Sequence, residues 1–203
     1  MKHVILFLAL LFPVWMVSAQ QDMGYKPGDT ARDFSLKNVD GKMVSMAGYK
    51  NVKGFVVIFT CNHCPFAKAY EDRIIALDKK YAALGYPVIA INPNDAKEEP
   101  EDSYENMVKR AKEKNYPFPY LLDETQEIAK AYGAKRTPHI YILNKDDKGA
   151  LKVMYVGAID DNFDDPAAVK EKYAESALDA LLKGAQPAIT ATKAIGCGIK
   201  WKK

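Results

Sequence analysis

Short apolar segments separated by polar turns run through most of the chain and predict alternating strands and helices. Residues 54–60, GFVVIFT, are apolar at nearly every position and rich in β-branched side chains, which is typical of a central strand buried on both faces. Further strands are expected at 86–92, 118–123, 139–144 and 150–157. Because turn residues bound each of these segments, the chain is expected to form a sheet of short strands.

Other segments carry apolar residues at helical spacing. Helices are expected from Cys64 to Gly85, around Ser103–Lys114, at 124–133 and at 165–184. Ser103 is a suitable N-cap, and Pro166 is expected in the first turn of the last helix. In the stretch 25–46, Asp40-Gly41 stands between alternating apolar positions and predicts an N-terminal β-hairpin.

The order of these elements indicates an α/β fold. Strands and helices alternate before a hairpin and a final helix, which predicts a central mixed β-sheet flanked by helices on both faces. One domain is expected over residues 20–183, and residues 184–203, which show no clear period, are expected to be a C-terminal tail packing on the domain.

The first residues have the order of a secretory signal peptide. Lys2 precedes an apolar run, and Ser18 and Ala19 form a small-residue cleavage site. Pro13 interrupts the run, which is shorter than the ~20 residues of a spanning helix. We therefore expect a signal peptide over 1–19 and a soluble exported protein, periplasmic or extracellular, with no membrane span after cleavage.

Charge and cysteine content narrow the functional classes. The formal net charge is +3, and the charged residues are interspersed except in the terminal KWKK, so a nucleic-acid partner is not expected. The chain contains 3 cysteines, too few for a scaffold held by disulfides. One close pair and a third thiol favour redox chemistry instead.

The pair lies in TCNHCP, where the strand 54–60 passes into a helix. Unpaired N–H groups at a helix start stabilise a thiolate, so a lowered pKa is expected there. Cys61 and Cys64 are spaced for a reversible disulfide, with Cys61 as the attacking sulfur and Cys64 as the resolving one. His63 lies between them and is expected to tune the couple. Pro65 suits the first turn of the helix.

A metal site is the weaker interpretation of these residues. Structural zinc requires four ligands, and the chain offers no second paired motif beside the three cysteines, His63 and His139. Copper(I) on two thiolates is a minor alternative. No metal or cofactor is expected beyond a redox-active Cys61–Cys64 disulfide.

Thr137-Pro138 precedes an apolar strand, where a proline is acceptable as the first residue or as a cis bond. Together with Cys61 and Cys64, it makes the chain similar to the thioredoxin superfamily. The resemblance implies a thioredoxin-like fold in which Thr137 and Pro138 lie against the disulfide. It also implies that the Thr137 backbone binds the extended chain of a partner.

Within that superfamily, 27–42 and 54–95 resemble the peroxiredoxin-like branch, also called alkyl hydroperoxide reductase/thiol-specific antioxidant or redoxin proteins. The resemblance covers about Lys26 to Lys183, and 192–201 is similar to the C-terminus of a CxxC-bearing subgroup. Cys64-Pro65 takes the place of the peroxide-reacting cysteine and its proline. Cys61 replaces the threonine of that pattern, and Val57 replaces a proline.

The leading hypothesis is therefore a thiol–disulfide oxidoreductase acting on protein thiols or disulfides with a redox partner protein. The alternatives are an antioxidant thiol peroxidase that uses Cys64 on peroxide, and a copper(I)-binding or partner-binding module. The secondary site candidates are Thr60, Pro65, Arg136 and Cys197. The resemblance implies an arginine that activates peroxide, and Arg136 is the positional candidate for it. Cys197 is either a third redox partner or a small apolar residue of the tail. The strand 54–60 carries no buried carboxylate, so any carboxylate needed for proton transfer must come from elsewhere.

Overall fold

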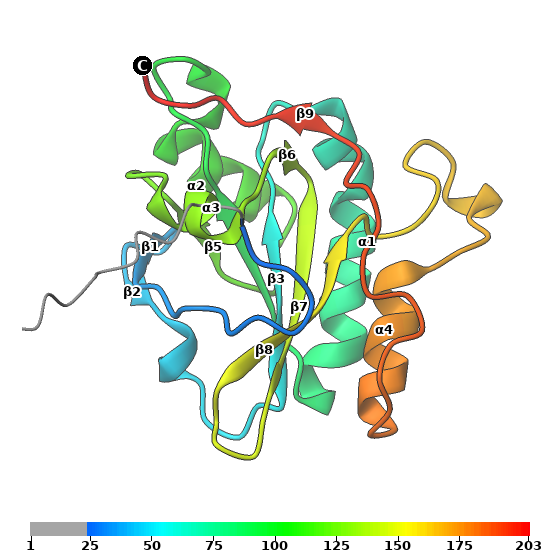
Figure 1. Ribbon diagram of the computed structural model, residues 1–203. Coiled ribbons are helices and arrows are strands. Elements are labelled where there is room, and N and C mark those ends of the chain that lie inside the picture. The colour runs from blue at the N-terminus through cyan, green and yellow to red at the C-terminus, as the bar shows by residue number, and fades with distance from the viewer. Residues whose placement is uncertain (1–23) are drawn as a thin grey trace, which may run out of the picture.

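The computed structural model describes residues 24–203, and the signal peptide expected over 1–19 lies outside the described residues. A mixed sheet of 7 strands in the order β2-β1-β5-β4-β3-β7-β8 forms the centre of this part of the chain (Figure 1). Its strands are β1 (Leu36–Asn38), β2 (Met43–Val44), β3 (Gly54–Phe59), β4 (Val88–Asn92), β5 (Tyr120–Leu122), β7 (His139–Lys145) and β8 (Leu151–Gly157). A second sheet pairs β6 (Arg136–Thr137) with β9 (Cys197–Gly198).

The connections follow the predicted α/β pattern. The α-helices are α1 (Pro65–Tyr81), α2 (Tyr104–Glu113), α3 (Glu127–Tyr132) and α4 (Tyr173–Leu182), and the short 3-10 helices are η1 (Met46–Gly48), η2 (Ala82–Leu84), η3 (Pro100–Asp102) and η4 (Pro166–Ala168). Strand β3 is parallel to β4 and antiparallel to β7. The predicted N-terminal hairpin is confirmed, because β1 and β2 pair antiparallel around the Asp40-Gly41 turn.

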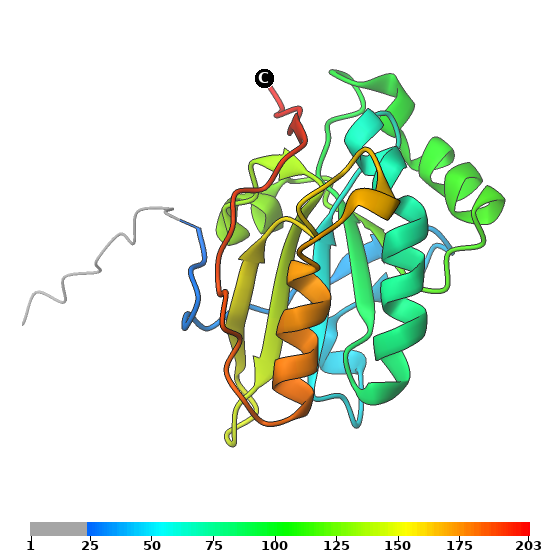
Figure 2. The same cartoon turned by 90° about the vertical axis from the view of Figure 1, so that its right-hand side faces the viewer.

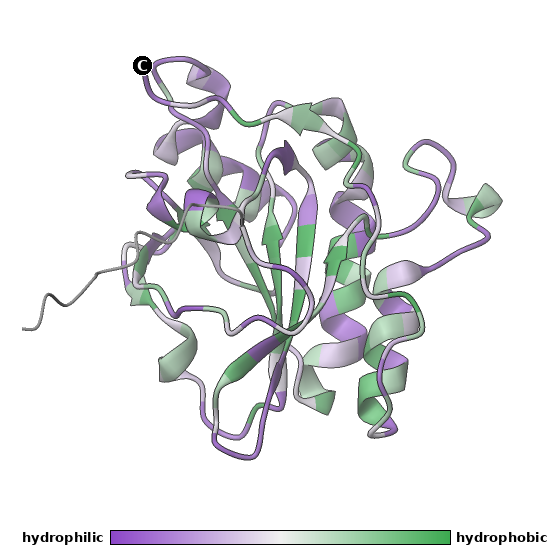
Figure 3. Cartoon of the chain, viewed as in Figure 1, coloured by the Kyte–Doolittle hydropathy of each residue, from purple (hydrophilic) through white to green (hydrophobic). Residues whose placement is uncertain are grey.

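The sheet is covered on both faces, as its uniformly apolar central strand requires. Alternate residues of β3 enter two separate cores. Val56 and Ile58 pack with α1, α2 and α4, whereas Phe55, Val57 and Phe59 pack with α3 and the N-terminal segment. Helices α1 and α4 lie along one face in Figure 2, and Figure 3 shows hydrophobic residues concentrated in the central strands.

The prediction of one helix over 165–184 is wrong in its first half. Residues 166–168 form a single 3-10 turn, and α4 begins only at Tyr173. The Asp165 carboxylate accepts from the Ala167 N–H at 2.8 Å, and Asp161 accepts from the Lys170 N–H at 3.0 Å. These side chains satisfy backbone donors in a loop conformation, and so compete with helical hydrogen bonds.

Strand directions bring three segments to one edge of the sheet. Since β3 and β4 are parallel, the segments that follow them emerge side by side, and they carry the cysteine pair and the loop that ends in η3. Since β7 runs antiparallel to β3 with Phe59 opposite His139, the Thr137-Pro138 pair that precedes β7 arrives at the same edge. Among residues 24–203, no helix is long and apolar enough to cross a membrane.

Candidate active site

The two cysteines of the predicted motif lie against Thr137. Cys61 is 4% exposed and Cys64 is fully buried. The Cys61 Sγ is 3.1 Å from the Thr137 hydroxyl oxygen, and the Cys64 Sγ is 3.2 Å from the Thr137 carbonyl oxygen. The Thr137–Pro138 peptide bond is cis. The structure therefore brings Cys61, Cys64 and the Thr137-Pro138 pair together.

The disulfide at this site is not the expected one. Cys64 is joined to Cys197, with a Cα–Cα distance of 6.0 Å, and Cys61 is a free thiol. The pairing follows from β9, which runs antiparallel to β6 and places Cys197 opposite Thr137. The tail thus places a third sulfur beside the motif, and in this structure Cys64 is bonded to Cys197 instead of to Cys61. Cys64 and Cys197 are 133 residues apart in the sequence, so no local sequence pattern predicts their contact.

The expectation of a lowered thiol pKa is also wrong for Cys61 in this state. Helix α1 begins at Pro65 with Cys64 as its N-cap, so Cys61 lies outside the first turn. Burial, followed by the nearby charge of Asp102, raises the pKa of Cys61 to about 12, against a smaller lowering by the Thr137 hydroxyl. Cys61 is therefore a protonated thiol near neutral pH, and its activation requires a proton acceptor.

Such an acceptor lies beside the sulfur. The Nδ1 atom of His63 is 3.6 Å from the Cys61 Sγ and 2.6 Å from Oδ2 of Asp102. The other ring nitrogen, Nε2, is 3.7 Å from a carboxylate oxygen of Glu99. Because the same nitrogen faces both sulfur and carboxylate, Nδ1 can accept the Cys61 proton when it is unprotonated and, once protonated, donates to Asp102. His63 therefore connects the buried thiol to a buried carboxylate.

Asp102 is the functional residue that the sequence analysis missed. It is fully buried at the end of η3, and its Oδ1 accepts from the backbone N–H groups of Asn62 and His63 at 2.6 and 3.1 Å. Its Oδ2 accepts from Nδ2 of Asn94 at 2.6 Å. The sequence signal is weak, since Asp102 belongs to an acidic loop in which several carboxylates look alike. Its position after β4, the parallel neighbour of β3, is the cue that distinguishes the loop.

The secondary candidates have different surroundings. Thr60 is buried, and its backbone N–H donates to the Ile91 carbonyl at 2.9 Å. Pro65 occupies the first turn of α1, as expected. Arg136 was a candidate for activating peroxide, but its Nη1 donates to the Gly196 carbonyl at 2.8 Å. Its guanidinium therefore binds the tail.

A metal ion has three potential ligands here. Atoms of Cys61, His63 and Asp102 all lie within 4.8 Å of one another. However, the Asp102 carboxylate already accepts from two backbone N–H groups and the Asn94 amide, and it contacts His63. A metal bound to Asp102 would displace part of this hydrogen-bonded arrangement, so the geometry suits proton transfer better than metal binding.

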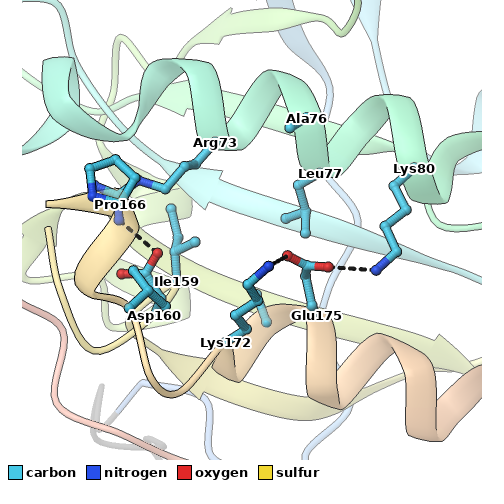
Figure 4. A pocket seen from close by; sticks show the side chains of 11 residues that line it. Arg73, Ala76, Leu77, Lys80, Ile159, Asp160, Pro166, Lys172 and Glu175 are labelled. Carbon is cyan, nitrogen blue, oxygen red and sulfur yellow. Dashed lines mark hydrogen bonds and ion pairs between the residues drawn. The ribbon is translucent and has the colours of Figure 1, made fainter.

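A separate cavity of about 260 Å³ lies between α1 and the segment that leads into α4 (Figure 4). Its charged residues pair with one another. Arg73 contacts Asp160, and Glu175 contacts both Lys80 and Lys172. Its α1 residues begin at Arg73, more than two turns beyond Cys64, and none of the three cysteines lines it. The chemistry of the thiols therefore belongs to the edge of the sheet and not to this cavity.

Comparisons with known proteins identify relatives of this chain. A solved structure of an uncharacterized conserved protein from Geobacillus kaustophilus matches with 44% identity and a TM-score of 0.81, covering 89% of this chain and 94% of that one. A hypothetical protein from Sinorhizobium meliloti 1021 matches with 35% identity and a TM-score of 0.78, over 88% and 96%. The thiol-disulfide oxidoreductase ResA of Geobacillus thermodenitrificans is 25% identical over 73% of this chain and 82% of its own. The AhpC/TSA family model matches residues 27–155, and the chain therefore belongs to the AhpC/TSA family.

Proposed function

We propose that this protein is a thiol–disulfide oxidoreductase that exchanges disulfides with protein substrates. One observation carries the proposal: the free thiol of Cys61 and the disulfide of Cys64 are packed together against Thr137. A thiol beside a disulfide is the arrangement from which exchange proceeds, by attack of a thiolate on one sulfur of the S–S bond. The name of the ResA relative supports the same chemistry.

In the active cycle, Cys61 and Cys64 alternate between dithiol and disulfide, and the spacing of the motif allows that bond. In its reduced form, Cys61 attacks a partner disulfide, a mixed disulfide forms, and the other partner sulfur leaves as a thiol. Cys64 then attacks Cys61, which releases the second partner thiol and leaves the Cys61–Cys64 disulfide. Two electrons pass from the protein to its substrate, and a redox partner protein restores the dithiol.

His63 and Asp102 supply the proton transfer. The buried thiol of Cys61 is a weak nucleophile because burial raises its pKa to about 12. Its proton passes to Nδ1 of the imidazole tautomer that carries its own proton on Nε2, 3.6 Å away, and the Nδ1–H of the imidazolium that forms is donated to Asp102 at 2.6 Å. Asp102 does not contact the substrate in this scheme. It is a positioning residue that orients His63 and stabilises its charged form.

The expected setting is outside the cytoplasm. Residues 1–19 have the order of an export signal, and an oxidising compartment supplies protein disulfides as substrates. We propose a periplasmic or extracellular location on this basis. Secretion of the full chain into the periplasm of an expression host, with mass spectrometry of the new N-terminus, tests it. A secreted protein should begin near Gln20, whereas a chain retaining Met1 in the cytoplasm would contradict the proposal.

The exchange activity is tested with purified protein and a protein disulfide such as insulin, in the presence of a dithiol reductant. We expect catalysed reduction that is lost in Cys61→Ser. The variant Lys80→Ala, which changes a cation of the separate cavity, is the control for general effects of substitution. Full activity in Cys61→Ser would remove Cys61 from the mechanism.

The Cys64–Cys197 disulfide favours one further candidate, a thiol peroxidase. Cys64 is the N-cap of α1 and is followed by Pro65, and its disulfide partner Cys197 matches the product of peroxide reduction resolved by a second thiol. In that reaction, peroxide oxidises the Cys64 thiol to a sulfenic acid, and Cys197 displaces water. Stopped-flow oxidation of the reduced protein by hydrogen peroxide distinguishes the two functions. A rate no faster than that of free cysteine rejects the peroxidase.

A further inference from the structure

The C-terminal segment lies along β6 as an added strand, as the red β9 beside β6 shows in Figure 1. Thr137 is opposite Cys197, and Arg136 is opposite Gly198. The Ile199 N–H donates to the Lys135 carbonyl at 3.3 Å, and Ile199 is 7% exposed. The tail therefore uses the backbone edge next to the cysteines in the manner of a bound extended peptide.

Of the two glycines beside Cys197, Gly196 lies closer to the Thr137 backbone. A Cβ atom added to Gly196 would lie 2.2 Å from the Thr137 carbonyl oxygen, a distance that no side chain tolerates. A Cβ atom added to Gly198 meets nothing within 4 Å. Glycines flank Cys197 on both sides, but only at Gly196 would a side chain collide with the Thr137 backbone. The site next to Thr137 is thus shaped for a small residue immediately before the cysteine that reaches Cys64.

The segment after Cys197 is held by polar contacts to two loops. The Lys200 N–H donates to Oδ1 of Asn94 at 2.9 Å, and the Lys200 carbonyl accepts from the Asp95 N–H at 2.9 Å. The Gln126 amide accepts from the Lys202 N–H and donates to the Lys200 carbonyl, both at 2.8 Å. A tail that merely covered an apolar surface would not need this set of backbone contacts.

We propose that residues 196–200 are an internal substrate strand and that Cys197 is a third redox-active cysteine. This rests on the proposed function, because the strand occupies the edge at which a partner polypeptide is exchanged. The Cys64–Cys197 bond then joins the tail to the resolving cysteine, beside the Cys61 thiol with which a partner forms its mixed disulfide. It also identifies the class of substrate, an extended polypeptide with glycine or another small residue before its cysteine.

The exchange between the Cys64–Cys197 and Cys61–Cys64 disulfides needs no external oxidant. The Cys61 thiol loses its proton to His63, and the thiolate attacks Sγ of Cys64. The Cys64–Cys197 bond breaks, the Cys61–Cys64 bond forms, and Cys197 leaves as a thiolate that takes the proton from His63. The protein contains one disulfide and one thiol before and after this step. Its result is a free tail, an open β6 edge and a Cys61–Cys64 disulfide, which the redox partner or a dithiol reductant returns to the dithiol that attacks a partner disulfide.

The disulfide distribution tests this proposal without any substrate. The full-length protein is oxidised mildly, its free thiols are alkylated, and its peptides are mapped by mass spectrometry without reduction. In wild-type protein we expect Cys64–Cys197 with Cys61 alkylated. Gly196→Ala should shift the distribution on the order of tenfold toward Cys61–Cys64, the ratio that corresponds to ~1.4 kcal/mol of lost docking free energy. The matched variant Gly198→Ala should keep the wild-type distribution.

A parallel insulin assay separates this proposal from the proposed function. We expect Gly196→Ala to exchange faster than wild type, because its β6 edge is open. Exchange by wild type, with the disulfide distribution of Gly196→Ala unchanged, would overturn the tail proposal alone. No exchange by any variant would overturn the proposed function and, with it, the substrate role of the tail. Circular dichroism of both glycine variants establishes that they are folded.

Discussion

The Asn94 side chain donates to Asp102 through Nδ2 at 2.6 Å, while its Oδ1 accepts from the Lys200 N–H at 2.9 Å. One buried amide therefore contacts both the docked tail and the carboxylate that holds His63. Release of the tail removes the Lys200 N–H from Oδ1 of Asn94, while the donation from Nδ2 to Asp102 does not involve the tail. The tail and His63, the proton acceptor of Cys61, are thus connected through the side chains of Asn94 and Asp102.

Replacing Asn94 with Ala should loosen the tail. The change leaves the Lys200 N–H without its acceptor and removes one of the donors to Asp102, and an unsatisfied buried group costs about 1–3 kcal/mol. Hydrogen exchange at residues 196–202 should accelerate. Asn106→Ala is the control, because Asn106 is an exposed amide on α2 that contacts the Pro100 carbonyl. Equal exchange in both variants would show that Asn94 does not hold the tail.

Replacing Asp102 with Asn should separate thiol acidity from activity. Loss of the negative charge lowers the pKa of Cys61, since that charge contributes to raising it. The exchange rate at neutral pH should nevertheless fall roughly a hundredfold, because His63 loses the partner of its charged form. The pH dependence of Cys61 alkylation and insulin reduction kinetics measure the two effects. If activity rises along with the thiolate fraction, Asp102 is not a positioning residue.

Alkaline pH should destabilise the protein through Cys61. Its pKa is about 12 in the fold against an ordinary value of 9.0, so between these values the unfolded chain loses a proton that the folded protein retains. The free energy of unfolding therefore falls as pH rises from about 9 toward 12, and this contribution is fully present below pH 9. Buried tyrosines act in the same direction. Urea unfolding of wild type and Cys61→Ala isolates the cysteine contribution, which should flatten the alkaline slope in the variant.

Acid should destabilise the protein through His139. This residue is 9% exposed at the start of β7, and burial, followed by the charge of Lys135, lowers its pKa to about 4 from 6.5. Between pH 6.5 and 4, the unfolded chain binds a proton that the folded protein does not, so stability falls as the pH decreases through this window. His139→Gln should reduce the slope of unfolding free energy against pH in urea titrations. An unchanged slope would assign acid sensitivity to other groups.

Local chemistry made much of the fold predictable. The apolar run of β3, the Asp40-Gly41 hairpin turn and the Ser103 cap each act within a few residues, and the structure contains all three; the Ser103 oxygen accepts from the Asn106 N–H. The late start of α4 at Tyr173 was harder to predict from the sequence. It depends on Asp161 and Asp165, whose side chains bind backbone groups that helical periodicity assigns to a helix.

The site was only partly predictable, because its decisive contacts join distant residues. The cysteine motif indicated a helix start and a thiol couple, but burial of Cys61 and the charge of Asp102 reversed the expected shift of its pKa. Neither the contact of Asp102 with His63 nor the bond between Cys64 and Cys197 has a local sequence signature. Both depend on which strand neighbours which, and that is a property of the assembled sheet.

The pairing of β9 with β6 also determines how strongly the tail competes with a partner polypeptide for the β6 edge. A strand tethered to its own binding edge competes with free partners at an effective concentration on the order of millimolar for a short flexible connection. A partner polypeptide at ordinary cellular levels is outcompeted while the tail remains docked. Under the tail proposal, access of a partner to the cysteines depends on whether Cys197 is bonded to Cys64, and not on partner concentration alone.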